Sequence, residues 1–93
     1  MFGILEKKTT LSKHGVSFEE ATTVFFDEYA IEYFDPDHSD NEDRFIMLGI
    51  SRMLRVLVVC YCYRESDTII RIISARKATR KESNNYRSKG GWK

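Results

Sequence analysis

The sequence predicts an α+β domain, with helices before and after an antiparallel sheet. Four runs with strand character follow one another at residues 30–34, 44–50, 55–63 and 68–74, a succession that is typical of an antiparallel meander. Helix signals flank this block at 6–14, 18–26 and 80–86. The 93 residues are enough for one domain, which we place at residues 1–87, with a flexible tail at 88–93.

Capping signals define the helices. Gly15 ends the first predicted helix in the C′ position. Ser17 and Glu20 form a predicted capping box that opens the second helix, with Val16 placed for a hydrophobic staple. Thr79 and Glu82 form the same pattern before the last helix. The two helices before the sheet are expected to form a helical hairpin.

The third predicted strand is the most buried. Its run 56–62 is apolar on both faces, so we expect it at the centre of the sheet. Cys60 and Cys62 share one face of this strand and are read as small hydrophobic residues of a reduced, cytoplasmic protein. The sequence shows neither a signal peptide nor an apolar run of membrane-spanning length, and no membrane partner is expected.

Basic residues gather around the last strand and helix. From residue 71 to 93 there are eight Lys or Arg and one acid, Glu82. Arg76 and Lys77 are predicted in the connection between strand and helix, and Arg80 in the first helical turn. A helix N-terminus offers unpaired N–H groups and partial positive charge, so these cations predict an anion site for phosphate.

This basic cluster has two interpretations. It can be a solvated helix face, or it can contact RNA or DNA phosphates. A more specific form of the second interpretation is RNA cleavage, in which the substrate 2′-OH attacks and the protein supplies a base, an acid and cations. No P-loop, GxGxxG or CxxC motif is present, so neither a cofactor nor a metal is predicted.

Two further features allow a functional and a structural interpretation. His14 can be a general acid or base, or a helix-end histidine bonded to backbone carbonyls. Phe45, Tyr61 and Tyr63 can stack on bases, or belong to the core of the sheet.

Several motifs in order resemble one family. They are Lys13-His14-Gly15-Val16-Ser17-Phe18-Glu19-Glu20-Ala21, Phe25-Phe26-Asp27, Asp35-Pro36-Asp37-His38-Ser39, Glu42-Asp43-Arg44-Phe45 and Arg71-Ile72-Ile73-Ser74-Ala75-Arg76-Lys77-Ala78-Thr79, with Glu82 and Tyr86. In these residues the chain resembles the BrnT family of bacterial toxins. The resemblance runs from about Lys13 to Tyr86.

The resemblance implies a fold similar to RelE-type ribonucleases and a toxin that cleaves RNA and stops translation. It also implies a BrnA-type antitoxin with a DNA-binding ribbon-helix-helix domain, in a toxin–antitoxin hetero-oligomer that binds its own operator DNA. The match to the family's motifs places catalytic roles on Arg71, Arg76, Arg80 and His14. Phosphate binding is assigned to Lys13, Lys77 and Lys81.

The start of the chain departs from the family pattern. Phe2-Gly3 stands where the family has Trp-Asp, Glu6 where it has Lys and Thr10 where it has Asn. The alternative prediction is therefore a catalytically weakened relative that acts as an antitoxin-binding co-repressor module.

Overall fold

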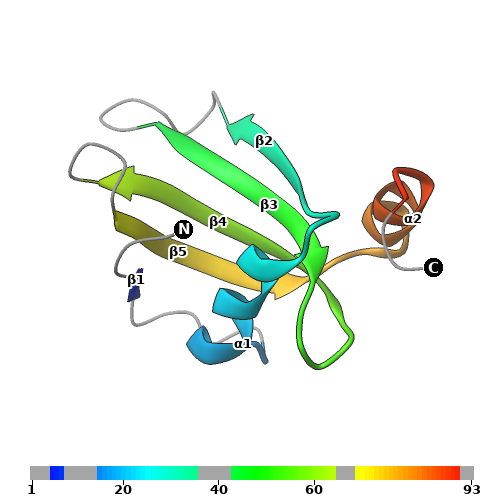
Figure 1. Ribbon diagram of the computed structural model, residues 1–93, viewed down its shortest axis with the longest axis horizontal. Helices are drawn as coiled ribbons and strands as arrows, with labels where there is room; N and C mark the ends of the chain where they lie inside the picture. Colours follow the sequence, from blue (N-terminus) through cyan, green and yellow to red (C-terminus); the bar gives the residue numbers. More distant parts are fainter. Residues whose placement is uncertain (1–4, 8–14, 36–42, 65–68, 91–93) are drawn as a thin grey trace.

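A five-stranded sheet forms the centre of the molecule. The computed structural model describes residues 5–7, 15–35, 43–64 and 69–90. The sheet contains β1 (Leu5–Lys7), β2 (Ile31–Asp35), β3 (Arg44–Ile50), β4 (Val56–Arg64) and β5 (Ile69–Lys77), arranged side by side in the order β1-β5-β4-β3-β2 (Figure 1). The described helices are α1 (Phe18–Thr23), the 3₁₀ helix η2 (Val24–Phe26) and α2 (Arg80–Ser88).

The predicted antiparallel meander is confirmed in β2 to β5. Each of these strands pairs antiparallel with the next one along the chain. The central place predicted for β4 is also confirmed, because β3 and β5 lie on its two sides. Residues that point to opposite faces of β4, such as Leu57 and Val58, are both buried. The predicted helix at 18–26 is formed by α1 and η2, so its last turn is tightened into a 3₁₀ helix.

Two cores lie on opposite faces of the sheet. On the α1 face, Leu57, Val59 and Tyr61 of β4 pack with residues before and within α1 and η2, namely Val16, Ala21, Val24 and Phe25. On the α2 face, Leu48 and Val58 pack with Tyr86 of α2. The α1 face therefore carries the larger core, and α2 covers one end of the other face.

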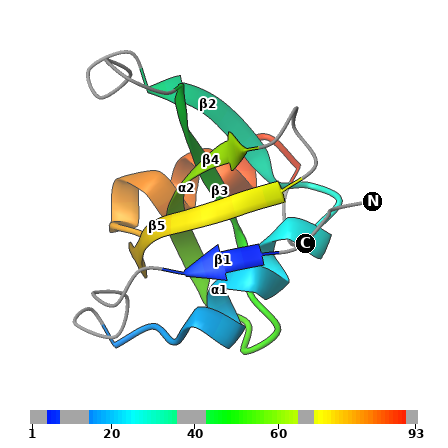
Figure 2. The same ribbon diagram turned by 90° about the vertical axis from the view of Figure 1, so that its left-hand side faces the viewer.

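The prediction of a helix at residues 6–14 is wrong at Glu6 and Lys7. These residues belong to β1, which pairs parallel with β5 in the register Glu6↔Arg71 and Lys7↔Ile72. Figure 2 shows β1 beside β5 with both arrows in the same direction. The pairing satisfies backbone groups of β5 that an edge strand would expose. Residues 8–14 lie outside the described part of the chain.

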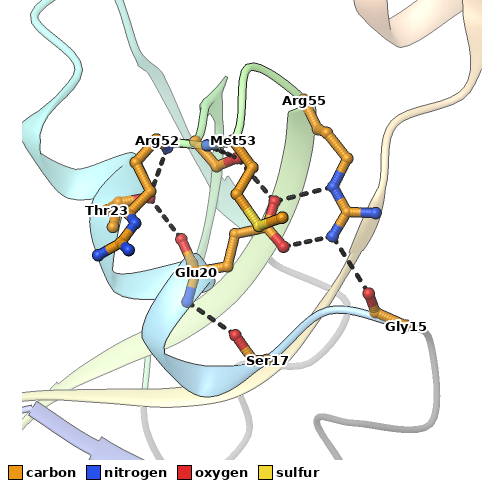
Figure 3. A network of polar contacts seen from close by, with 8 residues as sticks. Gly15, Ser17, Glu20, Thr23, Arg52, Met53 and Arg55 are labelled. Atoms are coloured by element: carbon orange, nitrogen blue, oxygen red, sulfur yellow. Dashed lines mark hydrogen bonds and ion pairs between the residues drawn. The ribbon is translucent and has the colours of Figure 1, made fainter.

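A buried carboxylate ties α1 to the β3–β4 connection. Ser17 caps α1 as predicted, because its Oγ accepts from the backbone N of Glu20 at 3.0 Å. The Glu20 side chain does not complete the predicted box. It accepts from Ser51 Oγ at 2.7 Å and forms an ion pair with Arg55 (Figure 3). The Arg55 hydrogen bond is the main cause that holds the pKa of Glu20 below its usual value.

The last helix begins as predicted, but β5 runs further than predicted. The Thr79–Glu82 capping box is formed: Thr79 N donates to Glu82 Oε1 at 2.8 Å, and Glu82 N donates to Thr79 Oγ1 at 3.2 Å. Arg76 and Lys77 lie on β5 and not in the connection, because β4 offers hydrogen-bond partners as far as Leu57.

Neither α1 nor α2, the α-helices in the described part of the chain, is long and apolar enough to cross a membrane.

Candidate nucleic-acid interface

A β-bulge in β5 decides which charged residues share a face. Tyr61 pairs with Ile72 and Cys60 pairs with Ser74, so Ile73 is an additional residue in β5. Side chains alternate between the faces of a regular strand, and an additional residue reverses that alternation. Ile72 and Ala75, three positions apart, both belong to the core of the α1 face. For the same reason Arg71 and Arg76, five positions apart, both lie on the α2 face.

Arg44 joins these two arginines on the α2 face. It is opposite Cys62 in the register of β3 and β4, and Cys62 is opposite Arg71 in the register of β4 and β5. Asp35 of β2 is opposite Arg44 on the other side. A row therefore crosses the sheet in the order Asp35, Arg44, Cys62 and Arg71, with a guanidinium group on each side of the buried Cys62.

A groove of about 290 Å³ opens on the α2 face. Arg44 and Asp35 stand at its β2–β3 side, and Arg76 and Ser74 at its β5 side. Its floor includes Val58 of the central strand. The complete lining consists of Asp35, Arg44, Ile46, Val58, Cys60, Ile73, Ser74, Ala75 and Arg76. A groove with arginines on two sides can hold the phosphate backbone of a single-stranded nucleic acid.

Arg76 is held in place by the glutamate that caps α2. Its Nη1 and Nη2 donate to Glu82 Oε1 and Oε2 at 2.8 and 2.9 Å, in a two-pronged ion pair. These hydrogen bonds are the main cause that lowers the pKa of Glu82 to about 2, and they raise the pKa of Arg76. Arg76 Nη1 also donates to Lys77 O at 3.3 Å.

The Arg76–Glu82 pair still leaves Arg76 able to bind a ligand. The Arg76 side chain is 46% exposed. A guanidinium group has five N–H donors. Within the described part of the chain, Glu82 and Lys77 O use three of them. The Nε hydrogen and one Nη2 hydrogen can therefore donate to phosphate oxygens while Glu82 fixes the orientation of the group.

The structure separates Lys77 from Arg76. Lys77 is opposite Leu57, whose side chain is buried in the core of the α1 face. The charge of Lys77 also contributes to the lowered pKa of Glu20 on α1, although less than the Arg55 hydrogen bond. The predicted cations therefore do not all face the groove: Arg76 lines it, whereas Lys77 lies on the α1 face.

The other predicted site residues have different positions. Arg80 and Lys81 are exposed in the first turn of α2, directly before Glu82. Lys13 and His14 lie outside the described residues. The predicted Phe45–Tyr61–Tyr63 platform lies on the α1 face, where Tyr61 is fully buried and makes ring contacts with Phe45 and Tyr63. The core interpretation of Tyr61 is confirmed.

Sequence reasoning missed Arg44 and Glu82 as parts of this site. Arg44 begins an otherwise apolar strand, and such a charged position in a strand was the available signal. Glu82 was identified only as a helix cap. Among the described residues, no group of three or more His, Cys, Asp or Glu side chains could hold a metal ion.

Comparison with known proteins agrees with the predicted resemblance. A model of the family described as "Ribonuclease toxin, BrnT, of type II toxin-antitoxin system" matches residues 6–82. A comparison with curated proteins gives no match. The family match covers most of the chain and includes all of β2 to β5 together with the start of α2. The chain therefore belongs to the BrnT family of ribonuclease toxins of type II toxin–antitoxin systems.

Proposed function

We propose that the groove on the α2 face is the site at which this BrnT-family toxin cleaves RNA. The observation that carries the proposal is the convergence of Arg44, Arg71 and Arg76 on one face, which depends on the bulge at Ile73. Two of these arginines, Arg44 and Arg76, line the groove itself. Arginine is well suited to phosphate because its planar donors can bind two oxygens at once.

The proposed reaction uses the 2′-OH of the RNA as the nucleophile and needs no metal. The 2′-oxygen attacks the adjacent phosphorus, and the bond from phosphorus to the 5′-oxygen breaks. A general base takes the 2′-OH proton and a general acid protonates the departing 5′-oxygen. Negative charge builds on the phosphoryl oxygens during the attack, and Arg76 and Arg44 stabilise it.

Glu82 positions Arg76 and is not the base in this proposal. A carboxylate with a pKa of about 2 that is paired with a guanidinium accepts a proton poorly at neutral pH. Arg80 and Lys81, exposed beside Glu82, attract the RNA backbone. His14 and Lys13 remain the candidates for proton transfer, from the resemblance alone.

The biological setting follows from the family. We propose that the toxin has a RelE-like fold, acts in the cytoplasm and inhibits translation through RNA cleavage. A BrnA-type antitoxin with a ribbon-helix-helix domain is proposed to neutralise it within a hetero-oligomer that binds operator DNA. The support is the family match, since a type II toxin has an antitoxin partner.

The chemistry is tested with purified protein and two short RNAs. The second RNA carries a 2′-deoxyribose at the position that is cut in the first. We expect cleavage of the first RNA in the presence of EDTA, a cyclic or 3′-phosphate product, and no cut at the deoxyribose. Cleavage at the deoxyribose would contradict the 2′-OH mechanism. Activity that EDTA abolishes and Mg²⁺ restores would contradict metal independence.

The alternative function is a weakened toxin that serves as a co-repressor. It is favoured by Glu6, where the family has a basic residue, since this position lies in β1 beside Arg71. Expression of the chain alone in a bacterium separates the two functions. Growth arrest with RNA decay supports the nuclease. Normal growth from soluble, folded protein that still captures its antitoxin supports the co-repressor.

A further inference from the structure

A second cavity lies beside the arginine groove. It has a volume of about 230 Å³ and is lined by Tyr33, Ile46, Leu48, Val58, Glu82 and Asn85, so it lies between the sheet and α2. Ile46 and Val58 also line the groove, so the two hollows share a wall. The cavity is smaller than the ~300–1,000 Å³ of pockets for drug-sized ligands. Its volume therefore fits one small planar ring system, either a single ring or two fused rings.

The lining combines apolar walls with a few polar groups. Ile46, Leu48 and Val58 form the apolar part, and Tyr33 adds an aromatic ring. Asn85 Nδ2 donates to Tyr33 Oη at 2.7 Å, which fixes the amide and the ring relative to one another. Within the described part of the chain, this bond uses one amide hydrogen of Asn85. The second hydrogen and the Oδ1 atom can pair with a ligand.

Glu82 connects the cavity to the groove. It lines the cavity and also holds Arg76 with both carboxylate oxygens. A ligand that places a phosphate at Arg76 therefore has its neighbouring group next to Glu82. In a nucleotide strand, the group next to a phosphate is a ribose with its base.

We propose that this cavity binds a nucleobase of the RNA strand whose phosphate lies in the groove, and that it prefers adenine. The inference rests on the proposed function, because it takes RNA as the ligand. Asparagine pairs with adenine in a two-pronged manner, through its carbonyl oxygen and one amide hydrogen. The Glu82 carboxylate favours an exocyclic amino group such as that of adenine and repels the carbonyl oxygen that uracil presents. The Tyr33 ring offers a face for stacking.

The test measures binding without cleavage. The probes are four single-stranded trinucleotides that contain 2′-deoxyribose throughout and differ only in the central base. Binding is measured by calorimetry, and nucleosides that lack phosphate are titrated in parallel by NMR. We expect the adenine probe to bind about ten-fold more tightly than the uracil probe, and adenosine to shift the resonances of Tyr33 and Asn85.

Two adjacent asparagines provide a matched pair of variants. Asn85→Ala should reduce the preference for adenine by about ten-fold. Asn84→Ala, which changes the exposed neighbour in the same helix, should keep that preference. Arg76→Ala should weaken the binding of all four probes by the same factor, because it removes a phosphate contact. Circular dichroism confirms that each variant is folded.

The outcomes separate this inference from the proposed function. Equal binding of the four probes, or equal effects of Asn85→Ala and Asn84→Ala, overturns the base site and leaves RNA cleavage at the groove intact. If no probe binds but adenosine still shifts Tyr33 and Asn85, the base site stands and the phosphate groove fails. If neither the probes nor adenosine bind, the inference is wrong.

Discussion

At the scale of single residues, the contact that matters most is the ion pair between Arg76 and Glu82. The two hydrogen bonds between these residues could not be predicted from the sequence, because Arg76 and Glu82 are six positions apart and belong to different elements. The cations themselves were predictable from composition. Their faces were not, because a bulge residue such as Ile73 has no local signature that distinguishes it from its neighbour Ile72.

Glu82→Gln should lower the free energy of unfolding at neutral pH by about 0.5–1 kcal/mol, since the pair is partly exposed. The folded pKa of Glu82 is depressed from 4.5 to about 2. The ionised Glu82 side chain therefore stabilises the folded protein fully above pH 4.5, and this stabilisation is lost as pH falls toward about 2. Urea unfolding at several pH values should show that the unfolding free energies of the variant and the wild type become equal in acid.

The control for this change is Glu28→Gln, which alters an exposed glutamate between η2 and β2. It should leave the unfolding free energy almost unchanged at all pH values. A difference between Glu82→Gln and the wild type that persists unchanged down to pH 2 would contradict the role given to the ion pair.

At the scale of elements, local signals predicted what local forces determine. The Thr79 cap, the apolar β4 and the Ser17 cap were all identified correctly, because each depends on residues close in sequence. Glu6 and Lys7, which belong to β1, were predicted to be helical. The three residues of β1 pair with β5, more than sixty positions later in the chain. A pairing between segments so far apart cannot be predicted from the residues of a short strand alone.

Thr79→Ala should destabilise the protein by about 1 kcal/mol, because the hydroxyl that accepts from Glu82 N is lost. Thr79→Ser keeps that oxygen and should remain close to the wild type. Thermal and urea unfolding of the three proteins measure the difference. Equal loss in the alanine and serine variants would show that the hydroxyl does not stabilise the start of α2.

At the scale of the whole molecule, the carboxylate of Asp27 connects the end of η2 to β3 and to α2. Asp27 follows η2, and its Oδ2 accepts from Ile50 N of β3 at 2.9 Å and from Tyr86 Oη of α2. Burial is the main cause that raises the pKa of Tyr86, which is fully buried. The α+β layout was predictable from the order of its elements, but a bridge between residues 27 and 86 exists only in the folded chain.

Tyr86→Phe should lower the free energy of unfolding by about 1.5–3 kcal/mol, because the hydrogen bond to the Asp27 carboxylate is lost while the ring of the side chain is kept. Tyr29→Phe is the matched control, since Tyr29 is 47% exposed. Chemical denaturation of both variants compares them directly. A loss of stability in Tyr29→Phe as large as that in Tyr86→Phe would contradict the bridging role of Tyr86.

The measurement that tests the central claim most directly is RNA cleavage by Arg76→Ala and Lys77→Ala, compared with the wild type. These adjacent residues lie on opposite faces of β5. If the groove on the α2 face is the cleavage site, Arg76→Ala should reduce the rate by about 100-fold or more, and Lys77→Ala should keep the wild-type rate. Equal losses in the two folded variants, or a loss confined to Lys77→Ala, would contradict the placement of the site.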